Sequence, residues 1–144
     1  MLLKLYNTIK YLLGINKLKS CPNSQEELYN IVYSWQLEFG REWGKPIHQK
    51  IDERISFLTD DEKESLGKLL KEAHTDISGK IYDTLDAEVK KHPEVDDYRT
   101  IVSKASENGC LEKIKKEIKK LYPWLSEENL THEISQQQYY MIMH

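Results

Sequence analysis

Apolar residues recur along this chain at the three- and four-residue spacing of amphipathic helices, and no alternating run is long enough to predict a strand. The pattern predicts an all-α fold, a single-domain bundle of five to six helices spanning residues 1–144, with a kinked central helix. Because the connections are short, neighbouring helices are expected to pack antiparallel. The expected helical segments are 2–19, 24–58 with a kink at 44–46, 60–91, 94–107, 111–121 and 126–144.

The central helix is predicted to begin at Ser24, because Ser24 and Glu27 have the spacing of a capping box after the break at Pro22. Its apolar residues cover well over half of the helical circumference, so the helix must be covered on several sides. The segment Gly44-Lys45-Pro46 is expected to kink or end it, since proline lacks the N–H group that a helix needs. The apolar residues are Leu28, Tyr29, Ile31, Val32, Tyr33, Trp35, Leu37, Phe39 and Trp43.

Residues 2–19 predict a short amphipathic helix with one narrow apolar face. Two interpretations compete: docking of this face on the rest of the domain, or contact with a membrane surface. Docking is the more common role of so short a terminal helix, and we favour it. Residues 1–22, the helix and its linker, form the only segment that we expect to be detachable. The apolar face comprises Leu2, Leu5, Tyr6, Ile9, Leu12 and Leu13.

Composition and charge argue against a disordered, a membrane-embedded and a nucleic-acid-binding protein. Apolar residues make up 39% and charged residues 31% of 144 residues, which indicates a folded chain outside the membrane. The net charge of −3 gives no global reason to expect nucleic-acid binding. We find neither a signal peptide nor a membrane span in the sequence, so a cytoplasmic location is expected. Cys21 and Cys110 are then two free thiols, with a disulfide between them as the open alternative.

Motifs that would carry metal or catalytic chemistry are missing from the sequence. No Glu-x-x-His pair of the di-iron type occurs, and neither cysteine lies in a signature that activates a thiolate. No phosphate-binding loop or nucleophile elbow is found. We therefore expect no metal and no cofactor, and an enzyme is the less favoured class.

Glu42 and Gln36 are polar residues that fall inside the apolar arc of the expected central helix. A buried carboxylate costs several kcal/mol, on the order expected for real proteins, unless it is paired. Partners considered for Glu42 are His48, His74, His132, a tyrosine hydroxyl or a lysine. A buried hydrogen-bond network that fixes helix register is the favoured interpretation. The alternative is a pocket for a polar ligand formed by Glu38, Arg41, Glu42 and Trp43.

Two stretches, WQLEFGREWGKPI at 35–47 and YPWLSEENLTHEISQQQYY at 122–140, resemble a family of small uncharacterised bacterial all-helical proteins. That family's pattern is a Trp-Glu-Gly-Arg-Trp-Pro segment followed later by a Trp-Glu-Asn-His-Tyr-Tyr segment. This chain departs from it at Gln137 and Gln138, where such relatives have Gly-Met. The resemblance implies a bacterial origin and no particular activity. It also implies that the central and last helices meet, so that Glu38, Arg41, Trp43, Asn129, His132 and Tyr139 converge.

These observations favour a non-enzymatic protein–protein interaction module, either an adaptor or an immunity-type partner. The surplus of aromatic residues, nine Tyr and three Trp, is typical of interfaces as well as of cores. The alternative is a small-ligand-binding or enzymatic bundle whose site lies between the central and last helices. Its ligand-binding residues would be Glu38, Arg41, Glu42, Trp43, His132 and Tyr139. We expect a protein partner and no nucleic acid, and leave open a homodimer and membrane-surface contact through residues 2–19.

Overall fold

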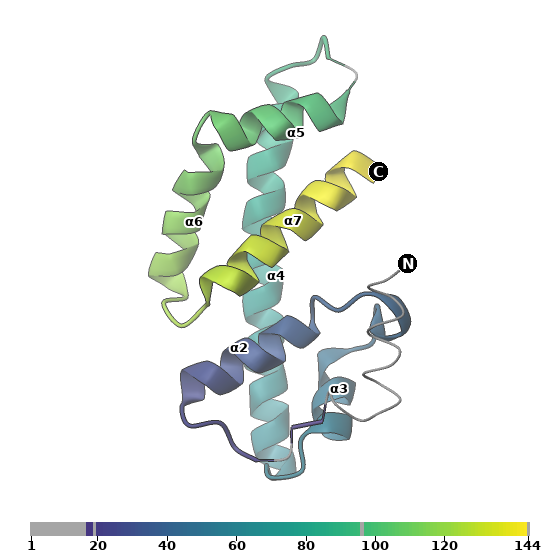
Figure 1. Ribbon diagram of the computed structural model, residues 1–144, viewed down its shortest axis with the longest axis vertical. Coiled ribbons are helices and arrows are strands. Elements are labelled where there is room, and N and C mark those ends of the chain that lie inside the picture. The colour runs from purple at the N-terminus through teal and green to yellow at the C-terminus, as the bar shows by residue number, and fades with distance from the viewer. Residues whose placement is uncertain (1–16, 19, 96, 144) are drawn as a thin grey trace. The chain divides into compact units, whose positions relative to one another are not determined.

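The computed structural model describes residues 17–18, 20–95 and 97–143. Within these residues the chain is all-α, as predicted, with six α-helices, one 3₁₀ helix (η1) and a single isolated β-bridge between Leu18 and Ile55. The elements, labelled in Figure 1, are α2 (Gln25–Trp35), η1 (Gly40–Glu42), α3 (Ile47–Arg54), α4 (Asp60–Lys90), α5 (Tyr98–Glu107), α6 (Cys110–Leu121) and α7 (Glu127–Met143).

The chain divides into two compact units, Met1–Glu72 and Ala73–His144. The boundary falls inside α4, so the first turns of this helix belong to the first unit and its remainder to the second. The single-domain organisation of residues 1–144 stays a prediction.

The first unit is built from α2, α3 and the first turns of α4. Ser24 begins α2 as predicted, and its hydroxyl accepts the N–H of Glu27 at 3.1 Å. At the start of α4, Thr59 and Glu62 form a reciprocal capping box, each accepting the other's backbone N–H through its side chain. Gln36 Nε2 also donates to the carbonyl of Leu70, which ties the end of α2 to α4. The buried apolar residues of this unit include Val32, Tyr33, Leu37, Ile47, Ile51, Ile55, Leu66 and Leu70.

The expected continuous helix over 24–45 is wrong in its second half, because α2 ends at Trp35. Gln36 caps it, and the N–H of Leu37 bonds to Ser34 O in a tight turn. A helix running on to residue 45 would hold Glu42 on the apolar arc, whereas the turn lets this carboxylate meet cations on α3. The predicted kink is therefore a break, and Trp43 lies outside α2 rather than on its apolar face.

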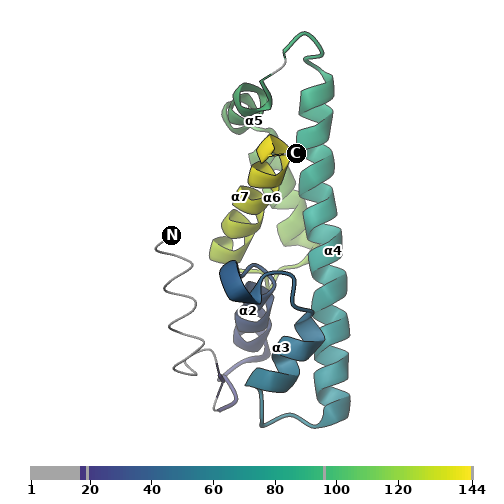
Figure 2. The same cartoon turned by 90° about the vertical axis from the view of Figure 1, so that its right-hand side faces the viewer.

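The second unit consists of the remainder of α4 with α5, α6 and α7, which lie along one side of that part of α4 (Figure 2). Ser126 precedes α7 and accepts the N–H of Asn129, as the capping pattern predicts. Two polar contacts join α4 to the loops: Tyr122 donates its hydroxyl to Asp76 at 2.6 Å, and Asn108 donates to Glu88 at 3.0 Å. The buried apolar residues of this unit include Ile77, Ile81, Leu85, Ile101, Ile118, Leu125, Leu130 and Ile134.

The predicted amphipathic helix over 2–19 lies outside the described residues, apart from Lys17 and Leu18. No helix in the described part of the chain is both long enough and apolar enough to cross a bilayer.

Candidate functional site

The candidate site begins with the loop of residues 36–46 that joins α2 to α3. Gly40 and Gly44 adopt φ angles of +77° and +76°. Residues with a Cβ adopt this left-handed conformation only at a cost in free energy. Gly40 is the first residue of η1, and Pro46 precedes the first residue of α3 with its φ fixed near −58°. The loop with these two left-handed glycines places Glu38 and Glu42 against α3, where Arg54 contacts both.

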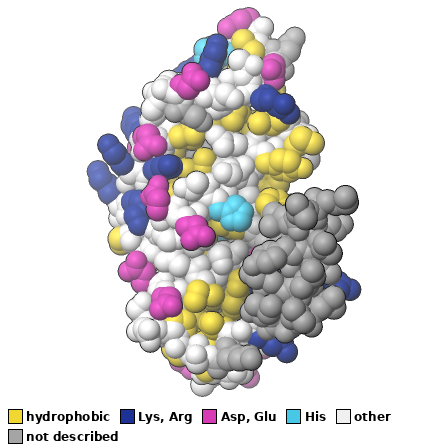
Figure 3. Space-filling model, viewed as in Figure 1, with side chains coloured by type: hydrophobic (Ala, Val, Ile, Leu, Met, Phe, Trp, Pro, Cys, Tyr) yellow, Lys and Arg dark blue, Asp and Glu magenta, His cyan; other side chains and the backbone are white. Residues whose placement is uncertain are grey.

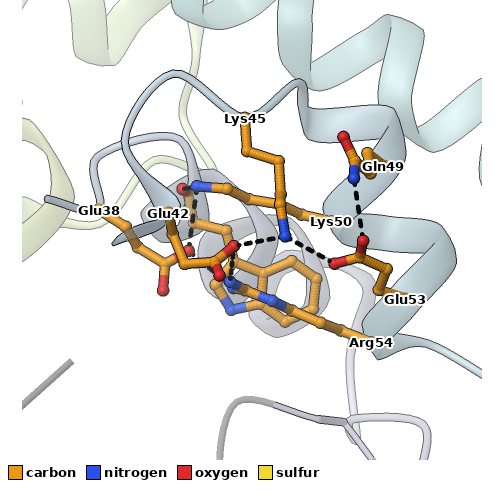
Figure 4. A network of polar contacts seen from close by, with 8 residues as sticks. Glu38, Glu42, Lys45, Gln49, Lys50, Glu53 and Arg54 are labelled. Atoms are coloured by element: carbon orange, nitrogen blue, oxygen red, sulfur yellow. Dashed lines mark hydrogen bonds and ion pairs between the residues drawn. The ribbon is translucent and has the colours of Figure 1, made fainter. Parts of the chain in front are cut away.

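Six charged residues from this loop and α3 form what we call the α2–α3 charge cluster: Glu38, Glu42, Lys45, Lys50, Glu53 and Arg54. At its centre, Arg54 donates to Glu38 Oε1 at 2.7 Å and to Glu42 Oε2 at 3.2 Å. Its guanidinium also lies 5.1 Å from the ring centroid of Trp35. Figure 4 shows these side chains pointing toward one another from the loop and from α3. Arg54 and Glu42 are 5% and 2% exposed, so this pair is buried from solvent.

Lys50 is the second buried cation of the cluster. Its Nζ donates to the backbone carbonyl of Trp35 at 2.6 Å and lies 3.2 Å from Glu38 Oε1. Burial is the main cause that lowers the pKa of Lys50, and the negative charge of Glu38 opposes this shift. The carbonyl of Trp35 is near the C-terminal end of α2, where carbonyls lack helical partners, so Lys50 also caps that helix.

The outer part of the cluster is closer to solvent. Lys45 Nζ lies 3.1 Å from Glu42 and 3.0 Å from Glu53, and Gln49 donates to the other oxygen of Glu53. The hydrogen bond that Lys45 donates to Glu53 is the main cause that raises the pKa of Lys45. The same hydrogen bond, followed by that from Gln49, lowers the pKa of Glu53. Three carboxylates thus face three cations, and the cluster carries no net charge.

The polar groups of the charge cluster are engaged with one another. Among the described residues, every buried side-chain nitrogen and oxygen has a hydrogen-bond partner. In the same residues, no group of three or more His, Cys, Asp or Glu side chains is arranged to hold a metal ion. The prediction that Glu42 is buried and paired is confirmed, with Arg54 and Lys45 as its partners. Its carboxylate is occupied by these contacts, as expected of a network that holds the loop against α3.

Phe39 and Trp43 form an aromatic pair on the same loop. Their rings are stacked with centroids 5.5 Å apart and an interplanar angle of 2°. Trp43 is 50% exposed, and Arg41, which lies between them in the chain, is also exposed. Of the four predicted site residues in the loop, Glu38 and Glu42 therefore point into the cluster, whereas Arg41 and Trp43 are at the surface.

The other predicted site residues lie on α7, in the second unit. His132 is exposed and Tyr139 is 52% exposed, whereas Asn129 is buried. Tyr139 contacts Tyr140 in an edge-on geometry, with ring centroids 6.1 Å apart. The convergence of these residues with Glu38, Arg41, Glu42 and Trp43 stays a prediction.

Sequence reasoning missed a buried polar row on α7. Glu133 is fully buried, lies 3.0 Å from His74 Nε2 on α4 and accepts a long hydrogen bond of 3.5 Å from Gln137. Burial, followed by the charge of Glu133, raises the pKa of Tyr140. The available signal was spacing, because these residues recur every three or four positions along one side of the helix. The buried members are Asn129, Glu133, Gln136 and Gln137.

Neither cysteine has the surroundings of a catalytic nucleophile. Cys21 and Cys110 are free thiols, as expected, and Cys21 is exposed. Burial, followed by the charge of Glu88, raises the pKa of Cys110, whose thiol donates to the carbonyl of Ala105. A raised pKa disfavours the reactive thiolate.

No family model, no curated protein and no solved structure matches this chain. The resemblance to a family of bacterial helical proteins therefore stays a prediction.

Proposed function

We propose that this chain is a non-enzymatic protein-binding module, of the adaptor or immunity type, acting in the cytoplasm of a bacterium. The observation that supports the proposal is the Phe39–Trp43 pair, a half-exposed indole held on a loop that six charged residues fix against α3. Tryptophan and arginine are the residues most enriched among binding hot spots, and both occur here within three positions. Free thiols at Cys21 and Cys110 fit a reducing compartment.

A rigid loop suits this role for an energetic reason. Association requires that flexible side chains and loops be ordered, at about 0.5–1.5 kcal/mol for each immobilised side chain. The stacked Phe39 ring limits the orientations of Trp43, and the two glycine turns and the charge cluster hold the backbone beneath it. Part of the ordering cost is therefore met before a partner arrives. The partner is expected to offer an apolar pocket for the indole.

The competing enzymatic or ligand-binding function receives less support. A ligand site in this loop would need the carboxylates of Glu38 and Glu42 to be available, whereas both form ion pairs with Arg54. A substrate would have to displace these ion pairs, and the cost of leaving a buried cation without its partner is several kcal/mol, on the order seen in real proteins.

The first experiment is native mass spectrometry of the full-length protein purified gently from its own host. A protein that co-purifies at fixed stoichiometry is expected, and a bound metal or small molecule would instead favour the alternative function. The isolated partner is then titrated against the wild-type chain and Trp43→Ala. Loss of an anchoring tryptophan is expected to weaken binding by about 30-fold or more, equivalent to about 2 kcal/mol.

The matched control is Tyr98→Ala, which removes an aromatic side chain of similar exposure, 41%, from α5. It is expected to leave the affinity unchanged within about twofold, in line with the small effect of most surface residues. Equal affinities of the wild-type chain and Trp43→Ala for the partner would contradict the proposal.

A further inference from the structure

The first unit has an apolar groove that neither the charge cluster nor the Phe39–Trp43 pair lines. It lies between the N-terminal half of α2 and the first turns of α4 and has a volume of about 360 Å³. Figure 3 shows hydrophobic side chains at the surface in the region where Figure 1 places α2. The apolar part of its lining is formed by Leu28, Tyr29, Leu58, Leu66 and Leu69.

The groove is elongated along α4. The α4 residues that line it run from Asp61 to Leu69 along one side of the helix, a rise of about 12 Å or about two turns. Leu28 and Tyr29 line it from α2. A groove of this form between two helices suits a third helix, because a helix presents an apolar stripe at positions i, i+3, i+4 and i+7.

Large apolar side chains of the groove keep part of their surface in contact with solvent. Leu69 is 38% exposed, although the neighbouring Leu66 and Leu70 are buried. Leu28, Tyr29 and Leu58 are only half-buried. This apolar area is concentrated in one place, and a docked apolar stripe would remove it from water.

The groove is acidic at one end. Among the described residues that line it, Asp61 and Glu62 are acidic and none is basic. Asp60 adds a third carboxylate to the first turn of α4, so the acids outweigh the positive charge of about one half at a helix N-terminus. Lys63, the next residue along the helix, is paired with Asp52 at 3.3 Å. The charge of the groove therefore complements a basic occupant and repels an acidic one.

We propose that the groove between α2 and α4 is a docking site for a basic amphipathic helix of a partner protein. The apolar stripe of that helix lies along Leu66 and Leu69, and its lysine or arginine side chains meet Asp61 and Glu62. The site uses none of the residues of the 36–46 loop, so it goes beyond the function proposed above and is tested separately.

The test is fluorescence anisotropy with two labelled synthetic peptides of about 14 residues, long enough to span the groove as a helix of about 21 Å. Both peptides have leucine at positions i, i+3, i+4 and i+7, and the remaining positions are lysine in one and glutamate in the other. The full-length chain is expected to bind the lysine peptide at least about tenfold more tightly than the glutamate peptide. Trp43→Ala is expected to bind the lysine peptide as the wild-type chain does, which distinguishes this proposal from the function proposed for the loop.

Two pairs of variants locate the binding. Leu69→Ser removes apolar area from the groove and is expected to weaken binding of the lysine peptide about tenfold, whereas Leu121→Ser, at a leucine 59% exposed on α6, changes it by less than about twofold. Asp61→Lys is expected to reduce the preference for the lysine peptide to less than about threefold. Glu64→Lys makes the same change of net charge at an exposed position of α4 outside the groove, and is expected to retain the preference.

Three outcomes would overturn the proposal. The first is equal affinity of the wild-type chain for the two peptides. The second is an equal effect of Leu69→Ser and Leu121→Ser on binding, with circular dichroism showing both variants folded. The third is a homodimer, measured by analytical ultracentrifugation, that dissociates in Leu69→Ser and persists in Leu121→Ser, because it would assign the groove to a second copy of this chain.

Discussion

Arg54→Met is the change that most directly tests the physical account of the α2–α3 charge cluster. Methionine keeps much of the aliphatic stem of arginine but removes the guanidinium that joins Glu38 at 2.7 Å and Glu42 at 3.2 Å. At an effective dielectric constant near 20, each of these pairs is worth about 5–6 kcal/mol of Coulomb energy before the cost of removing the ions from water. That desolvation cost is several kcal/mol for each ion, so the net value of the pairs is far smaller than the Coulomb energy.

Removing the cation alone leaves Glu42 buried, with the more exposed Lys45 as the remaining partner. Breaking a buried ion pair from one side typically costs about 3–5 kcal/mol, and we expect this range for Arg54→Met. For a chain of this size the loss corresponds to a decrease in Tm of roughly 10 °C or more. The double variant Arg54→Met with Glu42→Gln should be at least about 1 kcal/mol more stable than the sum of the single changes predicts, because no unpaired charge remains.

The assay is urea unfolding followed by circular dichroism and by tryptophan fluorescence, since Trp35 lies against Arg54. Lys63→Met is the matched control, because Lys63 pairs at 3.3 Å with Asp52, whose side chain is 74% exposed. A surface pair of this kind is worth about 0–1 kcal/mol. If Arg54→Met costs no more than Lys63→Met, the cluster does not stabilise the loop and the reasoning is refuted.

Two further predictions concern stability. Burial lowers the pKa of Lys50 below its ordinary value of 10.5. The Lys50 side chain therefore holds its proton more tightly in the unfolded chain than in the folded chain. The free energy of unfolding of the wild-type chain should therefore rise relative to that of Lys50→Met as the pH increases toward 10.5. Urea unfolding at several pH values measures this difference. A difference that stays constant with pH would contradict burial as the cause of the lowered pKa. Gly79→Ala in α4 should stabilise the chain by about 0.5–1 kcal/mol, because an added Cβ meets no atom within 4 Å. Gly44→Ala should instead destabilise the chain by about 1–2 kcal/mol, because residue 44 has a φ of +76°. Thermal unfolding of the two variants checks the sign, and a loss of stability in Gly79→Ala would count against the first estimate.

The helix starts were predictable because they depend on local hydrogen bonds. Ser24 with Glu27, and Thr59 with Glu62, each bind within a single turn, so the chemistry of four consecutive residues determines the boundary. The long apolar stripe of α4 was likewise visible from its spacing. The all-α class follows from these local signals alone.

The end of α2 at Trp35 was not predictable in the same way. Residues 36–43 have good helix formers and apolar residues at helical spacing, and Gly40, which adopts a φ of +77°, is the local residue that disfavours a continuing helix. A further cause lies on α3, where Lys50 and Arg54 attract Glu38 and Glu42 out of helical register. One signal did exist: both cations occupy the stripe that also contains Ile47 and Ile51, a position that charged residues avoid unless they are paired.

The candidate site was predictable in its residue types and less so in its geometry. The burial of Glu42 is inferred from an α-helical wheel, whereas Glu42 lies in the 3₁₀ helix η1, and the sequence does not point to Arg54 as one of its partners. Trp43 was assigned to the apolar face of a helix and lies instead half-exposed on a loop. Such outcomes depend on contacts between segments, which periodicity does not encode.

The charge cluster has a consequence for the order in which the chain folds. Its contacts join residues separated by only three to sixteen positions, as in Lys45 with Glu42 and Arg54 with Glu38. Closing loops of this length costs little entropy and takes on the order of 10–100 ns for ten residues. The α2–α3 hairpin can thus form before α4 is in place, and its charges then attract one another in the still-hydrated chain, where desolvation has not begun. The ion pairs would therefore help to align the loop with α3 early in folding, in addition to stabilising the folded first unit.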